Sequence, residues 1–214
     1  MRFRTAVCLY MISGCTGAGD SAAEDRGICP PYSGIDPTST RTWSYAGEIR
    51  SAPATDEVSI APVDGSSDEF ARESLLTVVD DDATITTLTS EQLRCDDEGL
   101  ALLSSTAIET TVNAETGAET SETTDTTFEP PARLLIWDIE YGDGWLYYHY
   151  TYEYRYLEVE KEEPLHTELG TYSTLLLEMS AGYITTWRNE DVGVIRYDIG
   201  NPGAGDMWLV GTSF

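Results

Sequence analysis

The chain has 214 residues, which is enough for one domain with a substantial hydrophobic core. Its 38 acidic residues outnumber the 12 basic ones and give a formal net charge of −26. A field of that sign repels nucleic acid and anionic headgroups, which argues against both as partners. Because the carboxylates are spread along the chain, we interpret them as a hydrated surface; binding of divalent cations or of a basic partner is the alternative.

The N-terminus has the layout of a secretory signal, with a basic start, a short apolar run and then small residues. The run is far shorter than the roughly 20 apolar residues that span a bilayer. The segment Ile12-Ser13-Gly14-Cys15 resembles the bacterial lipobox, which implies a signal peptide over residues 1–14 and a lipidated Cys15 that anchors the mature chain to a membrane. The alternative is an ordinary signal cleaved after Ala23, which would leave a soluble periplasmic or secreted protein.

Residues 15–29 are small, polar and acidic, and we expect a flexible tether there, followed by a β-rich domain over residues 30–214. Thr16 follows the cysteine at a position where aspartate, in diderm bacteria, often implies retention in the inner membrane. The resemblance to lipoproteins therefore implies the outer membrane of the cell envelope.

Four cysteines are present, and two of them are assigned by the reading above. Cys8 is removed with the signal and Cys15 carries lipid. Cys29 and Cys95 then remain in an oxidising compartment, where one disulfide between them is the simplest expectation. On the chain-entropy model this bond stabilises the fold by roughly 4 kcal/mol.

The first half of the domain contains strand patterns separated by turn signals. Alternating or β-branched runs predict strands over residues 42–50, 74–79, 83–89, 91–95 and 100–108. Gly99 ends an acidic turn, Asp96-Asp97-Glu98-Gly99, in which positive φ is expected. The best candidate for a helix is the weakly periodic segment 69–76. Residues 109–128 form an acidic, threonine-rich excursion that fits either a solvated hairpin or a disordered loop.

The second half is richer in aromatic residues. Its patterns predict strands over residues 133–139, 145–159, 171–179, 182–187, 193–199 and 206–210. The spacing of all these strands indicates a mostly β protein with a meandering antiparallel sheet. A faint internal echo links Trp43-Ser44-Tyr45 to Trp145-Leu146-Tyr147, and residues 95–100 to 187–194. Two similar half-sheets would explain the echo, and chance similarity among hairpins would explain it as well.

Three segments of the second half, 134–145, 170–178 and 186–196, resemble consecutive strands of a broad set of uncharacterised bacterial envelope proteins. Arg188-Asn189 departs from that pattern, which has an aromatic and a small residue at this place. The resemblance implies a single, strongly curved antiparallel sheet, an open half-barrel with few or no helices beyond the signal segment. It is distantly similar to lipoprotein carriers of the LolA/LolB type, whose concave side holds acyl chains, although a fold alone does not fix a function.

The most distinctive local feature is a run of alternating tyrosines. If residues 145–159 form one strand, alternate side chains share a face. One face then carries Tyr148, Tyr150, Tyr152, Tyr154 and Tyr156, whereas Tyr147 and His149 lie on the other. The tyrosines would line a cavity for an apolar ligand, or they would pack on the protein's own core.

Catalytic motifs are absent from the sequence. The two histidines, His149 and His166, have no nucleophile near them in sequence, and no Gly-x-Ser-x-Gly elbow occurs. The acidic runs at 80–82 and 96–98 lack the spacing of a calcium loop, and no zinc pattern is present. We therefore expect neither an enzyme nor a cofactor or metal site.

The sequence favours a membrane-anchored envelope lipoprotein that binds a lipid or another apolar molecule without catalysis. The alternative is a structural or protein-binding envelope module that uses the acidic surface of residues 109–128. The expected partners are the membrane, through the lipid, and an apolar small molecule or an envelope protein.

Overall fold

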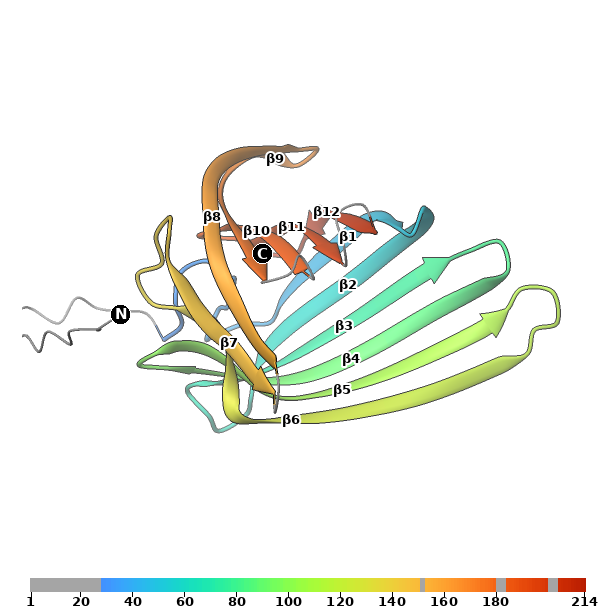
Figure 1. The fold of residues 1–214 in the computed structure, drawn as a ribbon, viewed down its shortest axis with the longest axis horizontal. Coiled ribbons are helices and arrows are strands. Elements are labelled where there is room, and N and C mark those ends of the chain that lie inside the picture. The colour runs from blue at the N-terminus through green and yellow to red at the C-terminus, as the bar shows by residue number, and fades with distance from the viewer. Residues whose placement is uncertain (1–27, 151–152, 180–183, 200–203) are drawn as a thin grey trace, which may run out of the picture.

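The computed structural model describes residues 28–150, 153–179, 184–199 and 204–214, and these contain no helix (Figure 1). They form one 12-stranded antiparallel sheet that curves through 281° into a nearly closed barrel. The predicted mostly β fold with one strongly curved antiparallel sheet is confirmed. Since the described residues are strands and loops, none of their segments is a helix capable of crossing a membrane.

The chain builds the sheet as two successive meanders of six strands. The first comprises β1 (Arg41–Ile49), β2 (Ala52–Pro62), β3 (Glu69–Val79), β4 (Ala83–Asp96), β5 (Gly99–Asn113) and β6 (Glu119–Ile136). The second comprises β7 (Gly144–Tyr150), β8 (Glu153–Thr167), β9 (Gly170–Met179), β10 (Ile184–Asn189), β11 (Gly193–Ile199) and β12 (Gly205–Thr212).

The first strand of one meander pairs with the last strand of the other: β1 lies beside β12 from Trp43↔Thr212 to Ile49↔Gly205. The sheet therefore runs from β6 through β1 and β12 to β7, and its two edges, β6 and β7, are consecutive in the chain. The indole Nε1 of Trp145 on β7 donates a hydrogen bond of 3.0 Å to the carbonyl of Arg133 on β6. This contact spans the seam between the two edges.

The internal echo falls on equivalent positions of the two meanders. Trp43 and Tyr45 lie on β1, the first strand of its half, and Trp145 and Tyr147 lie on β7, the first strand of the other. The echoed turns join the fourth and fifth strands of each half, β4 to β5 and β10 to β11. The topology thus repeats in the order that the sequence similarity suggests.

Several sequence predictions need correction. Residues 145–159 are not one strand but a hairpin, in which Trp145 on β7 pairs with Leu157 on β8. Residues 69–76 are not helical but belong to β3. Of the two readings of the acidic excursion, the hairpin is correct: Glu109 on β5 pairs with Glu122 on β6. As predicted, Gly99 has a positive φ, 134°.

A hydrophobic core fills one end of the barrel. Its central side chains, among them Phe70, Leu93 and Leu209, are almost completely buried. The polar ends of two aromatic residues on β1 are satisfied across the interior: Trp43 Nε1 donates to the carbonyl of Val192 at 2.8 Å, and the Tyr45 hydroxyl donates to that of Val194 at 2.9 Å. Such bonds allow large amphipathic side chains to be buried without leaving a hydrogen-bond donor unpaired.

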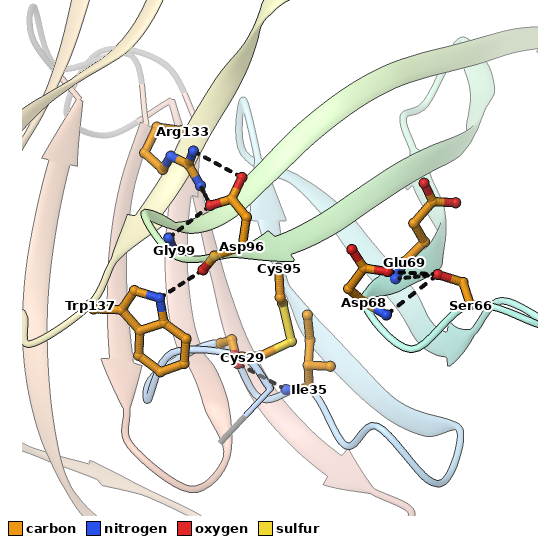
Figure 2. The surroundings of a disulfide bond; sticks show 11 residues. Cys29, Ile35, Ser66, Asp68, Glu69, Cys95, Asp96, Gly99, Arg133 and Trp137 are labelled. Atoms are coloured by element: carbon orange, nitrogen blue, oxygen red, sulfur yellow. Dashed lines mark hydrogen bonds and ion pairs between the residues drawn. A yellow bond between two sulfur atoms is a disulfide. The ribbon is translucent and has the colours of Figure 1, made fainter. Parts of the chain in front are cut away.

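The N-terminal arm, residues 28–36, packs against this core and is linked to it by a disulfide. Cys29 forms the predicted disulfide with Cys95 at the end of β4, with the Cα atoms 5.2 Å apart. Figure 2 shows the indole of Trp137 beside this bond, donating to the carbonyl of Asp96 at 2.8 Å, and the guanidinium of Arg133 on the Asp96 carboxylate. The arm therefore closes the core end of the barrel.

Candidate ligand cavity

A cavity of about 410 Å³ lies inside the barrel, on the side of the core away from the disulfide. The order along β4 shows the layering: Thr87, Thr89 and Glu91 line the cavity, Leu93 belongs to the core and Cys95 forms the disulfide. The volume lies within the range of small-molecule sites in proteins, roughly 300–1,000 Å³.

The cavity wall is mostly apolar, because strand alternation directs one set of side chains inward. On β3, Ser74 and Leu76 line the cavity, whereas Leu75 between them is on the outer face and 43% exposed. The apolar lining comes from both meanders: Val58, Leu76, Leu134, Leu157, Leu177, Met179, Ile184, Val194 and Ile199.

A buried carboxylate, Asp56 on β2, is one polar group of the lining and is only 5% exposed. Its two oxygens accept hydrogen bonds from the Ser74 hydroxyl at 2.7 Å and from the Tyr197 hydroxyl at 2.6 Å. Burial, followed by the charge and hydrogen bond of Asp56, raises the pKa of Tyr197, so this phenol keeps its proton at neutral pH. Asp56 thus has two hydroxyl donors and forms no ion pair among the described residues.

An ion pair between Arg72 on β3 and Glu91 on β4 forms a second polar group in the lining. Tyr147 on β7 faces the same interior, and its pKa is raised by burial and then by the charge of Glu91. Because the carboxylate of Glu91 is matched by Arg72, the pair contributes no net charge to the cavity.

Arg188, at the end of β10, is the remaining charged side chain of the lining. Its Nη1 donates to the backbone carbonyl of Tyr32 in the N-terminal arm at 3.1 Å, and its Nε is buried without a hydrogen-bond partner. Burial, followed by the nearby charge of Arg72, lowers the pKa of Arg188 to about 10. It therefore remains charged at neutral pH, in a place where a charge is unfavourable unless paired.

The predicted tyrosine lining rested on a single strand over 145–159, and the hairpin removes that basis. Tyr156 on β8 is 44% exposed, pairs with Leu146 and is not part of the cavity lining. The side chains of Tyr148, Tyr150, Tyr152 and Tyr154 lie outside the described residues. Tyr147, which the single-strand reading placed on the opposite face, is a lining residue.

The other predicted sites are distributed as follows. Cys15, the expected lipidation site, and the side chain of His149 lie outside the described part of the chain. His166 is exposed, with its Nδ1 2.9 Å from the Thr171 hydroxyl. Asp96 and Glu98 pair with Arg133, and no group of side chains suited to a metal ion occurs among the described residues.

The polar lining residues were missed because each of them is unremarkable within its own strand. Arg72 and Glu91 are cross-strand partners on the consecutive strands β3 and β4, whereas Arg188 on β10 joins them around one space only when the sheet closes. One signal was available: Arg188 departs from the envelope-protein pattern, which has an aromatic residue there. A charged residue at an inward position of a strand is a pointer to a binding site.

The arrangement provides a partly open, mostly apolar cavity with one guanidinium that has no carboxylate partner among the described residues, which suits binding of an amphipathic molecule. No protein-family model, no curated protein and no solved structure matches the chain.

Proposed function

We propose that the protein is a membrane-anchored envelope lipoprotein that binds a lipid or another apolar molecule in the barrel cavity, without catalysing its conversion. The observation that carries this proposal is the cavity of about 410 Å³, whose wall consists mainly of aliphatic side chains. Removing apolar surface of a ligand from water into such a wall contributes roughly 25 cal/mol per Å². The signal layout and Cys15 would hold this site at a membrane, where apolar molecules are available.

The nearly closed barrel supports the proposal because a strongly curved sheet encloses a ligand on most sides. The core and the N-terminal arm fill one end, so the cavity is blocked there by buried side chains such as Phe70. A ligand would then enter from the other end and lie along the inner faces of β2–β4 and β8–β11.

The experiment uses full-length mature protein with Cys15→Ser, purified without detergent and examined by native mass spectrometry. A discrete additional mass that organic extraction removes would support a bound apolar ligand. Thr186→Phe should then reduce its occupancy, because Thr186 lines the cavity between Leu177 and Tyr197 in neighbouring strands.

Thr185→Phe is the matched control, since Thr185 is adjacent on β10 but is not a lining residue. Equal loss of occupancy in both variants would count against the cavity as the site. If the purified protein carries no ligand and takes up none from added lipid extract, the proposal is wrong.

A second candidate function is a protein-binding module, favoured by the ordered form of the acidic excursion. The hairpin of β5 and β6 extends beyond the barrel in Figure 1, and residues 114–125 are exposed. Replacing 110–121 by a two-residue Asn-Gly turn would keep the Glu109↔Glu122 pair and shorten the hairpin. Unchanged cross-linking to envelope proteins in that variant would exclude the hairpin as a partner surface.

A further inference from the structure

We propose that the cavity selects amphiphiles with an anionic head group, a carboxylate or a phosphate, and that this group binds the guanidinium of Arg188 while the apolar tail lies along the aliphatic wall. The inference rests on the proposed function, because it names the chemical class of the ligand that the cavity would hold.

Arg188 has unsatisfied hydrogen-bonding capacity. A guanidinium carries five N–H donors and no acceptor. Among the described residues, its one hydrogen bond is to the carbonyl of Tyr32, and its Nε is buried without a partner. Planar carboxylates and phosphates match this fork with two parallel hydrogen bonds, which neutral oxygens do less well.

Both carboxylates of the lining already have hydrogen-bond or ion-pair partners among the described residues. Asp56 accepts hydrogen bonds from two hydroxyl groups, and Glu91 forms an ion pair with Arg72. No carboxylate of the described residues forms an ion pair with Arg188. Arg188 is therefore the cationic side chain of the lining that has no carboxylate partner among the described residues, and an anionic group of a ligand would supply one.

The charge of a second guanidinium, that of Arg72, acts on Arg188. Arg72 lies close enough to Arg188 to lower its pKa, an effect that adds to the effect of burial. An anion placed beside Arg188 would offset this repulsion and supply the charge partner that a buried guanidinium lacks. The lining as a whole holds two arginines and two carboxylates and so has no net charge, in a chain whose formal net charge is −26.

The lining residues of β10 would set the orientation of a bound amphiphile. Arg188, Thr186 and Ile184 are alternate residues of β10, and all three line the cavity. Four residues of a strand span roughly 13 Å, so the guanidinium and the aliphatic end of this row are separated by a distance suited to an extended tail. The head group would lie beside the core and the N-terminal arm, and the tail would point toward Ile184.

The test is a titration of the full mature chain, with Cys15→Ser, against four probes that share a dodecyl chain: dodecanoate, dodecyl phosphate, dodecanol and dodecylammonium. Isothermal titration calorimetry is performed below the micelle concentration of each probe. We expect at least one anionic probe to bind tenfold or more tightly than dodecanol, which corresponds to about 1.4 kcal/mol. The tighter of the two anions identifies whether the natural head group is closer to a carboxylate or to a phosphate.

Arg188→Met should abolish the preference for the anion while leaving dodecanol affinity within about twofold, and Arg188→Lys should retain part of it. The control is Arg50→Gln, which removes the same charge from an exposed turn and should leave the preference intact. Equal binding of dodecanol and both anions by the unaltered chain would overturn the inference and leave the proposed function standing. Failure of all four probes, dodecanol included, would overturn both.

Discussion

The disulfide between Cys29 and Cys95 offers a stability prediction whose size follows from the chain. The bond closes a separation of 66 residues. For a loop of that length, the chain-entropy relation lowers the conformational entropy of the unfolded state by roughly 15 cal/mol/K, which stabilises the fold by about 4 kcal/mol at 25 °C. That is a large share of the roughly 5–15 kcal/mol by which native domains are stable. Reduction should therefore destabilise the protein markedly without changing its fold.

The assay is equilibrium unfolding in urea, followed by tryptophan fluorescence, on the Cys15→Ser chain with and without dithiothreitol. With an m-value of about 3 kcal/mol/M, a loss of 4 kcal/mol lowers the urea midpoint by roughly 1.3 M. The double variant Cys29→Ala/Cys95→Ala should unfold near the reduced midpoint, lowered a little further because Cys95 is 3% exposed and its sulfur packs in the core.

The same double variant must show no response to dithiothreitol, which makes it the control for effects of the reductant itself. A midpoint shift below about 0.3 M on reduction of the unaltered disulfide would refute the reasoning. It would mean that the N-terminal arm detaches before the barrel unfolds, so that the bond constrains a segment outside the cooperative unit.

Three further predictions concern single residues. Gly99→Ala should lower the free energy of unfolding by about 3 kcal/mol or more, because the position has φ 134° and a Cβ would lie 2.1 Å from a carbonyl oxygen of β6. Gly117→Ala is the control: its φ is 67° and a Cβ would meet open space, so the loss should be only about 1 kcal/mol, and equal urea midpoints for the two variants would contradict this. Arg188→Met should lower the free energy of unfolding of the ligand-free protein by no more than about 1 kcal/mol, because it removes one hydrogen bond together with a buried charge. A loss of about 3 kcal/mol or more, measured by thermal unfolding, would assign Arg188 a structural role instead. Burial acts to raise the pKa of Asp96, but the hydrogen bonds and charge of Arg133 outweigh it, so the folded-state pKa lies below the usual 3.8. The ionised carboxylate therefore stabilises the fold above about pH 4, and this contribution is lost as the pH falls through the lowered pKa. Asp96→Asn should make the free energy of unfolding fall less steeply as the pH is lowered. An unchanged dependence on pH would show that the pair with Arg133 contributes nothing.

Much of the strand order could be predicted from the sequence because alternation and turn chemistry are local signals. Gly99 after three acidic residues marked the turn between β4 and β5, and the structure has that turn with the positive φ expected there. The disulfide followed by elimination, since Cys29 and Cys95 were the two cysteines not assigned elsewhere.

The hairpin of β7 and β8 could not be predicted because its turn region lacks the usual signals. Between His149 and Tyr156 there is no glycine, proline, asparagine or aspartate, so the alternation reads through as one strand. The cavity could not be predicted from the sequence either. Arg72 and Arg188 are 116 residues apart in sequence (188 − 72), and they line one cavity only because β1 pairs with β12.

That β1–β12 pairing has a consequence for how the chain reaches its native state. β1, the first of the described strands, pairs with β12, the last of them, so one edge of β1, including Trp43 and Tyr45, lacks its hydrogen-bonded neighbour until β12 has been synthesised. An uncovered strand edge is a template for association between unfinished molecules. The high negative charge of the chain, −26, would act against such association, because like-charged half-built sheets repel one another.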